Sequence, residues 1–134
     1  MLEQLGISED TLNFIHNYKT AAMFKAAVRI GAILGKADEN RLNILTKLAE
    51  MYGLAFQIKD DILDVTSTLE ELGKTPGKDE SVNKATYVKF YGLDGAKEKL
   101  NSLCDKTYDI INTELNNSEI MKYIVNYLRV EYKC

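Results

Sequence analysis

Proline is nearly absent from this chain, since Pro76 is the only one among 134 residues. Because proline interrupts helices and strands by removing a backbone N–H, a chain so poor in it can form long helices. A domain of this length buries roughly two thirds of its unfolded surface. Apolar residues recur at helical spacing, and no stretch alternates as a strand would. The sequence therefore predicts an all-α helical bundle, with residues 1–134 forming a single unit.

The expected helices are separated by glycines and by breaks in the apolar pattern. They cover Ile7–Leu34 (with a break near Lys19-Thr20), Asp38–Thr66, Thr86–Tyr91, Asp94–Leu115 and Ser118–Glu131. Gly35 is expected to end the first helix in the left-handed conformation. The stretch Ser67–Ala85, with two glycines and the proline, lacks periodicity, and a loop of this length is usually functional or disordered.

Side-chain size predicts how these helices pack. Small residues dominate Thr20–Leu34, which predicts a helix at the centre of the bundle. Gly53 lies inside a helix at a cost of about 1 kcal/mol relative to alanine, which indicates a close helix crossing. The last helix has one apolar face, made of Ile120, Tyr123, Ile124, Tyr127 and Leu128.

Charge and cysteine content exclude several classes of protein. The net charge is −3, which argues against nonspecific nucleic-acid binding. No apolar run is long enough for a membrane span, and the N-terminus lacks a signal pattern. We therefore expect that the chain is not an integral membrane protein. Two cysteines, Cys104 and Cys134, favour a reducing cytoplasm over a disulfide framework. A single histidine, His16, makes a zinc site or a Ser-His-Asp triad improbable.

An acidic cluster is the clearest candidate for chemistry. Asp60 and Asp64 lie one helical turn apart, with Asp61 at the edge of the same face and Gln57 one turn before Asp61. Like charges this close repel one another in apolar surroundings, and a divalent cation removes the repulsion. Oxygen ligands favour Mg²⁺, which takes one or two carboxylates together with waters and phosphates. A solvated acidic face is the competing interpretation of the three aspartates.

Lysines surround this cluster in the sequence. Lys74, Lys78 and Lys84 follow in the glycine-containing stretch, and Lys19 precedes the helix rich in small residues. Lysine is a good point-charge partner for a phosphate. Together with the aspartates, these lysines indicate a site for a magnesium–diphosphate ligand, although each lysine alone is typical of a solvated surface.

Several motifs together resemble the trans-isoprenyl diphosphate synthases, and bacterial farnesyl diphosphate synthases in particular. They are Ile15–Thr20, Gly31–Gly35, Phe56–Val65, Glu71–Asp79, Lys84–Val88 and Tyr91–Leu93. The resemblance implies the C-terminal part of the isoprenoid synthase fold. It also implies a prenyltransferase that joins isopentenyl diphosphate to an allylic diphosphate after ionisation assisted by Mg²⁺.

The resemblance assigns roles to residues in those motifs. Asp60 would bind Mg²⁺ directly, and Asp61 and Asp64 would support it, partly through water. Lys19, Lys74 and Lys84 would hold the allylic diphosphate. Thr20, Phe56 and Gln57 would line the reacting end, where an aromatic face and an amide oxygen stabilise positive charge. The resemblance thus implies a catalytic set of Asp60, Asp61, Asp64, Lys19 and Thr20.

One departure from the family pattern limits these roles. Family members carry two Asp-rich motifs on opposite walls of the cavity, and this chain has only the second. The chain therefore resembles the C-terminal half of a synthase without its N-terminal half. We expect it to be inactive alone, and to form a homo-oligomer or to associate with the missing half.

Two other functions stay open. A non-catalytic helical interaction or regulatory module would retain the fold and use the apolar surface that the missing helices leave exposed. A class I terpene cyclase shares aspartate-rich magnesium chemistry, but Lys74, Lys84 and the Lys19-Thr20 pair favour a chain-elongating synthase.

Overall fold

The structure is a computed structural model that describes residues 8–16, 20–72 and 86–129. Within these ranges the chain forms five helices and no strand, which confirms the predicted all-α fold. They are α1 (Glu9–His16), α2 (Ala22–Leu34), α3 (Glu39–Leu72), α4 (Tyr87–Glu114) and α5 (Glu119–Leu128). Over the same ranges, no helix combines the length and the apolar character that crossing a membrane requires.

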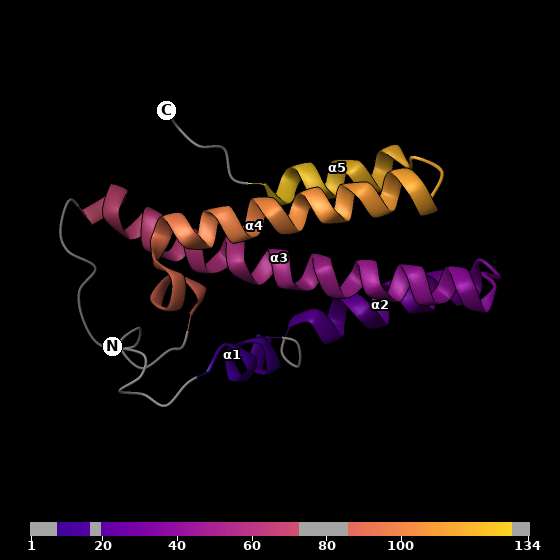
Figure 1. The fold of residues 1–134 in the computed structure, drawn as a ribbon, viewed down its shortest axis with the longest axis horizontal. Helices are drawn as coiled ribbons and strands as arrows, with labels where there is room; N and C mark the ends of the chain where they lie inside the picture. The colour runs from indigo at the N-terminus through magenta and orange to yellow at the C-terminus, as the bar shows by residue number, and fades with distance from the viewer. Residues whose placement is uncertain (1–7, 17–19, 73–85, 130–134) are drawn as a thin grey trace.

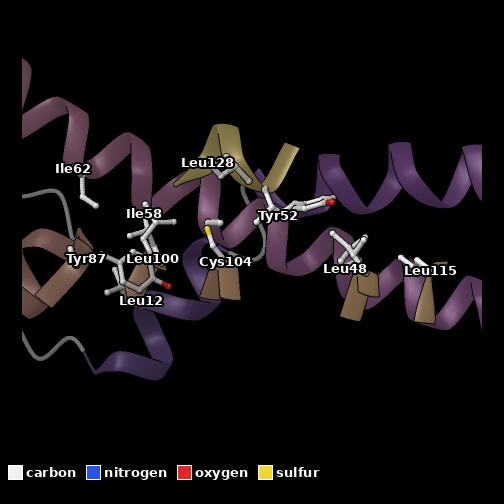
Figure 2. Packing of buried hydrophobic residues seen from close by; sticks show 14 residues of the cluster. Leu12, Leu48, Tyr52, Ile58, Ile62, Tyr87, Leu100, Cys104, Leu115 and Leu128 are labelled. Carbon is white, nitrogen blue, oxygen red and sulfur yellow. The ribbon is translucent and has the colours of Figure 1, made fainter. Parts of the chain in front are cut away.

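Helix α3 is the central element of the bundle. It packs against α2 on one side and against α4 and α5 on the other (Figure 1). Its broad apolar surface supplies much of the core, in which Leu12 of α1 and Leu100 of α4 are also buried (Figure 2). The Tyr52 hydroxyl of α3 donates a hydrogen bond to the Met121 carbonyl of α5 at 2.9 Å. The breadth of the apolar pattern in the sequence therefore corresponds to burial on several sides.

The predicted end of α3 at Thr66 is wrong, because the helix continues to Leu72. The Thr66 hydroxyl donates to the Ile62 carbonyl one turn earlier at 3.0 Å, so threonine is accommodated inside the helix. At the other end, a carboxylate oxygen of Asp38 accepts from the Arg41 N–H at 2.7 Å and caps the first turn. The rest of the predicted loop, residues 73–85, lies outside the described residues.

The end of α2 also differs from the expectation. Lys36, with φ 56°, is left-handed, whereas Gly35 has φ −77°. The Ala37 N–H bonds to the Ala32 carbonyl at 2.9 Å, and the Lys36 N–H bonds to the Ile33 carbonyl at 3.0 Å. This pair of bonds is a Schellman motif, and its geometry places the left-handed residue at position 36.

Helix α2 does not lie at the centre of the bundle, so that prediction is wrong for the part of the chain described. It packs against α3, and the opposite side is exposed. Ala26 and Ala27 lie on the exposed side together with Met23 and Leu34, which are 73% and 78% exposed. The small side chains therefore mark a surface suited to another helix.

A glycine interrupts α4 where the sequence predicts a break. Gly92 has φ 75° and ψ 170°, a conformation open almost only to glycine, and it separates the first turn of α4 from the rest of the helix. The first turn is capped by Thr86, whose hydroxyl accepts from the Lys89 N–H at 3.2 Å.

The sequence correctly predicts the helix α5, but only part of its predicted apolar face is buried. Val125 and Leu128 point into the core, whereas Ile120, Tyr123 and Tyr127 are 66–75% exposed. The helix ends at Leu128 and not at Glu131, because Arg129 is extended. Helical spacing identifies apolar stripes but cannot tell which of two stripes meets the core.

Candidate functional site

A stripe of apolar and acidic side chains runs along the exposed side of α3. Phe56, Asp60, Leu63 and Asp64 follow one another at helical spacing, and all four are exposed. Phe56 is 41% exposed and Leu63 44% exposed, which is unusual for side chains of this size within a long central helix. The stripe therefore combines carboxylate oxygens with an apolar surface.

The three clustered aspartates do not share one environment. Asp60 and Asp64 are exposed, while Asp61 is only 1% exposed and lies between α3 and α4. Their positions follow from helix geometry, because residues four apart share a face and the next residue is rotated by about 100°. The structure thus brings two of the predicted metal ligands to the surface stripe and buries the third.

Among the described residues, a side chain and a backbone N–H donate hydrogen bonds to Asp61. Its Oδ1 accepts from Nε2 of Gln57 at 3.1 Å, and its Oδ2 accepts from the backbone N–H of Tyr87 at 3.0 Å. A buried carboxylate is tolerated when such donors satisfy it. This aspartate connects α3 to the first residue of α4.

Thr20 and Gln57 form the remaining part of the site that the structure describes. The Thr20 hydroxyl, half-buried just before α2, donates to Oε1 of Gln57 at 3.1 Å. Gln57 is 7% exposed and lies one turn after Gly53 on α3. The predicted closeness of Thr20 and Gln57 is therefore present, and one hydrogen-bond chain joins both to Asp61.

Tyr87 and Asn13 also belong to this network, although the sequence analysis assigns no role to either. Tyr87 is fully buried, and its hydroxyl donates to Oδ1 of Asn13 on α1 at 2.5 Å. Burial raises the pKa of Tyr87, and the charges of Tyr91, Asp61 and Glu9 raise it further, so the phenol keeps its proton. Asn13 carries no motif signal, because its role depends on a contact between helices far apart in the sequence.

The aromatic part of the site lies across the boundary between α2 and α3. The ring of Phe56 packs against Phe24, with centroids 5.6 Å apart and planes inclined by 46°. The exposed part of Phe56 belongs to the same stripe as Asp60. An aromatic surface next to carboxylates can stabilise a cation by its ring quadrupole.

The donor set fits Mg²⁺ in the form that this ion usually takes in proteins. No group of three or more carboxylate, imidazole or thiol side chains comes together in the described ranges to hold a metal on its own. Asp60 and Asp64 offer two exposed carboxylates one turn apart, and Mg²⁺ is commonly held by one or two carboxylates plus waters and phosphates. Lys19, Lys74 and Lys84, predicted to contact the diphosphate, lie outside the described residues.

Comparisons with known proteins agree on one family. The polyprenyl synthetase family model matches residues 2–128. A chloroplastic geranylgeranyl pyrophosphate synthase of Capsicum annuum is 52% identical over 93 residues, which are 69% of this chain and 25% of that protein. A geranylgeranyl diphosphate synthase of Cyanophora paradoxa is 42% identical over 121 residues, covering 87% of this chain and 40% of that protein.

A solved structure shows the same arrangement of helices. A crystal structure from Marinomonas sp., assigned as a farnesyl-diphosphate synthase, superposes with a TM-score of 0.71 at 36% identity. The match covers 91% of this chain and 40% of that one. The chain thus spans between a quarter and two fifths of the length of these relatives. With nearly all of its sequence matched, the chain belongs to the polyprenyl synthetase family.

Proposed function

We propose that this chain forms one wall of a prenyltransferase that condenses isopentenyl diphosphate with an allylic diphosphate. The observation that carries the proposal is the exposed stripe of α3, where Asp60 and Asp64 stand one turn apart beside Phe56. Family membership and the names of the relatives support prenyl chain elongation. The product is a short-chain prenyl diphosphate, of the farnesyl or geranylgeranyl type.

In this proposal Asp60 and Asp64 would hold Mg²⁺, and the bound ion would supply positive charge for a departing diphosphate. The apolar and aromatic surface of Phe56 and Leu63 excludes water from the allylic carbon as positive charge develops there. Lys19, Lys74 and Lys84 contribute further charge toward the diphosphate oxygens. Thr20 and Gln57 present polar oxygens next to Phe56 and so orient the reacting end.

The exposed side of α1 and α2 is where we place the rest of the enzyme. Phe14 of α1 and Ile30 of α2 are each 59% exposed, and Ile30 lies at helical spacing with the exposed residues Met23, Ala26, Ala27 and Leu34 of α2. Apolar surfaces of this kind favour association. We propose that helices equivalent to the remaining part of the relatives cover this surface. They would bring the family's first Asp-rich motif, which this chain lacks, opposite Asp60.

Calorimetry with magnesium pyrophosphate tests the metal-binding wall. The isolated chain is expected to bind weakly, and Asp60→Ala is expected to lower the affinity at least about tenfold. Asp109→Ala, which removes an exposed carboxylate of α4 away from the stripe, is the matched control and should leave binding unchanged. No binding, or binding that is indifferent to Asp60→Ala, would contradict the proposal.

A second experiment tests the division of the enzyme into two walls. Labelled isopentenyl and dimethylallyl diphosphates are incubated with the chain alone and with the N-terminal half of a relative. Turnover is expected only in the mixture. Turnover by the chain alone would show that one wall suffices.

A non-catalytic interaction module is the second candidate, and the exposed apolar residues of α2 and α5 favour it. On this alternative, the chain binds a protein partner through these surfaces and does not bind magnesium pyrophosphate. The calorimetric experiment therefore separates the two functions.

A further inference from the structure

Asp61 differs from its two neighbours in the acidic cluster in a way that the cluster pattern does not predict. It is 1% exposed, whereas Asp60 and Asp64 are exposed. One of its oxygens faces the side chain of Gln57 and the other faces the backbone of Tyr87. Its carboxylate is therefore directed at protein donors between α3 and α4. Its hydrogen bonds connect α3 to the first residue of α4 inside the protein.

The carboxylate also fixes the orientation of the Gln57 amide. Because an ionised carboxylate only accepts hydrogen bonds, the amide group facing Asp61 must be the NH₂. The carbonyl oxygen of Gln57 is then directed away from Asp61 and toward Thr20, whose hydroxyl donates to it at 3.1 Å. The hydrogen bonds run in one direction, from Thr20 through Gln57 to Asp61.

The same carboxylate holds the beginning of α4. The N–H of Tyr87 belongs to the first turn, where no helical carbonyl is available to accept it. A negative charge near this end is also favoured by the helix dipole. Since the Tyr87 hydroxyl bonds to Asn13, the network that starts at Thr20 ends on α1.

We propose that Asp61 is a positioning residue and not a metal ligand. Its carboxylate sets the direction of the Gln57 amide and holds the Thr20 hydroxyl and the start of α4 beside the stripe that carries Asp60 and Asp64. This assignment rests on the proposed function, because it requires that Asp60 and Asp64, and not Asp61, bind the metal ion. The hydrogen-bond network can be tested without the metal.

Exchanging the two side chains gives a specific test. Gln57→Glu alone replaces the amide that donates to Asp61 with a second carboxylate, so two carboxylates stand side by side. Asp61→Asn alone removes the charge and allows the Gln57 amide to turn over. The double variant, Gln57→Glu with Asp61→Asn, keeps the net charge, and the new amide at position 61 can donate to the new carboxylate at position 57 while its oxygen still accepts from Tyr87.

The free energies of unfolding of the four proteins form a double-mutant cycle. Gln57→Glu is expected to raise the unfolding equilibrium constant more than about tenfold, and adding Asp61→Asn should reverse most of that rise. If Gln57→Glu does not fold, folding of the double variant is itself the rescue. Effects that simply add, or a double variant that fails to fold, would overturn the proposal.

A spectroscopic signature separates positioning from a general packing role. The side-chain NH₂ of Gln57 is assigned in a ¹H–¹⁵N spectrum by its loss in Gln57→Glu. In Asp61→Asn this signal and the Thr20 side-chain signals should shift, while signals from the far end of α3 near Leu45 should not. Unchanged Gln57 and Thr20 signals would contradict the inferred chain of hydrogen bonds.

Binding of Mn²⁺ in the presence of pyrophosphate tests the second half of the proposal. Asp61→Asn, which removes the carboxylate at position 61 and adds none nearby, should bind within about threefold of the parent chain, whereas Asp60→Asn should lose about tenfold. An equal loss in both would make Asp61 a ligand and overturn the proposal. If the parent chain does not bind Mn²⁺, the proposed function fails, and the unfolding cycle still decides the role of Asp61.

Discussion

Gly53 of α3 lies directly against Ala21, so that a Cβ added to the glycine would be 2.4 Å from the Ala21 Cα and 2.7 Å from its Cβ. This contact is the close helix crossing that a glycine inside a long helix predicts. Ala21 follows Thr20, and Gly53 precedes Gln57 by one turn, so the contact sets the separation across which Thr20 and Gln57 hydrogen-bond. Packing of two small residues therefore supports the polar part of the site.

Gly53→Ala is expected to destabilise the chain by about 1–3 kcal/mol, because the new methyl group meets backbone atoms that cannot move aside. Urea denaturation measures the change in the free energy of unfolding. Gly31→Ala is the matched control, since its added methyl group has nothing within 4 Å, and it should stabilise the chain by about 0.5–1 kcal/mol. Equal effects of the two substitutions would contradict a close crossing at Gly53.

Lys36→Gly is expected to stabilise the chain by about 1 kcal/mol. Lys36 is left-handed, with φ 56°, and glycine adopts this conformation without the steric cost that a Cβ imposes. Thermal unfolding should show a higher midpoint for Lys36→Gly. Lys36→Ala keeps the Cβ and removes only the charge, so it should have little effect; if it stabilises as much as glycine, the cause is charge and not conformation.

The sequence predicts several helix boundaries because glycines mark them. The break at Gly92 is an example, since φ 75° with ψ 170° is accessible to glycine and to almost no other residue. The end of α3 is harder to predict, because Thr66 can satisfy its hydroxyl inside a helix by bonding to the Ile62 carbonyl. The local helix propensity at Thr66 does not show whether α3 ends there or continues to Leu72.

The sequence predicts much less about burial. In α5 the predicted apolar face includes both Tyr127, which is exposed, and Leu128, which is buried, and only contact with α3 and α4 decides which side chains of the helix reach the core. The same limit applies to the acidic cluster. Asp61 is one position from Asp60, yet the Tyr87 N–H that determines its role is 26 positions away in the sequence.

Cys104 is expected to react with thiol reagents only when the chain unfolds. It is 1% exposed within the core, and burial raises the pKa of its thiol, so both access and the reactive thiolate are suppressed. In a Cys134→Ser background, labelling by a disulfide reagent at pH 8 should be about a thousandfold slower than in urea. The destabilising Gly53→Ala substitution should speed labelling, whereas Gly31→Ala should not.

Lowering the pH is expected to weaken the link between α1 and α4. Hydrogen bonds of Glu9 with Tyr91 and then with Lys99 lower the pKa of the Glu9 carboxyl below its ordinary value of 4.5. Because the folded-state pKa is the lower one, this contribution to stability is complete above the unfolded-state pKa and is lost as the pH falls through the folded-state pKa. Both charged side chains are partly exposed, so the contribution is small.

A ¹³C NMR titration of the Glu9 carboxyl measures this pKa directly. Tyr91→Phe removes the hydrogen bond that lowers the pKa of Glu9 most and should move this pKa upward, toward 4.5, while leaving the Lys99 contact at 3.0 Å in place. Lys99→Met should also raise it, because the substitution removes both a hydrogen bond and a positive charge. An unchanged pKa in Tyr91→Phe would show that the phenol does not bond to Glu9 in solution, and that α1 is attached to α4 through the Lys99–Glu9 contact and the bond between Asn13 and Tyr87.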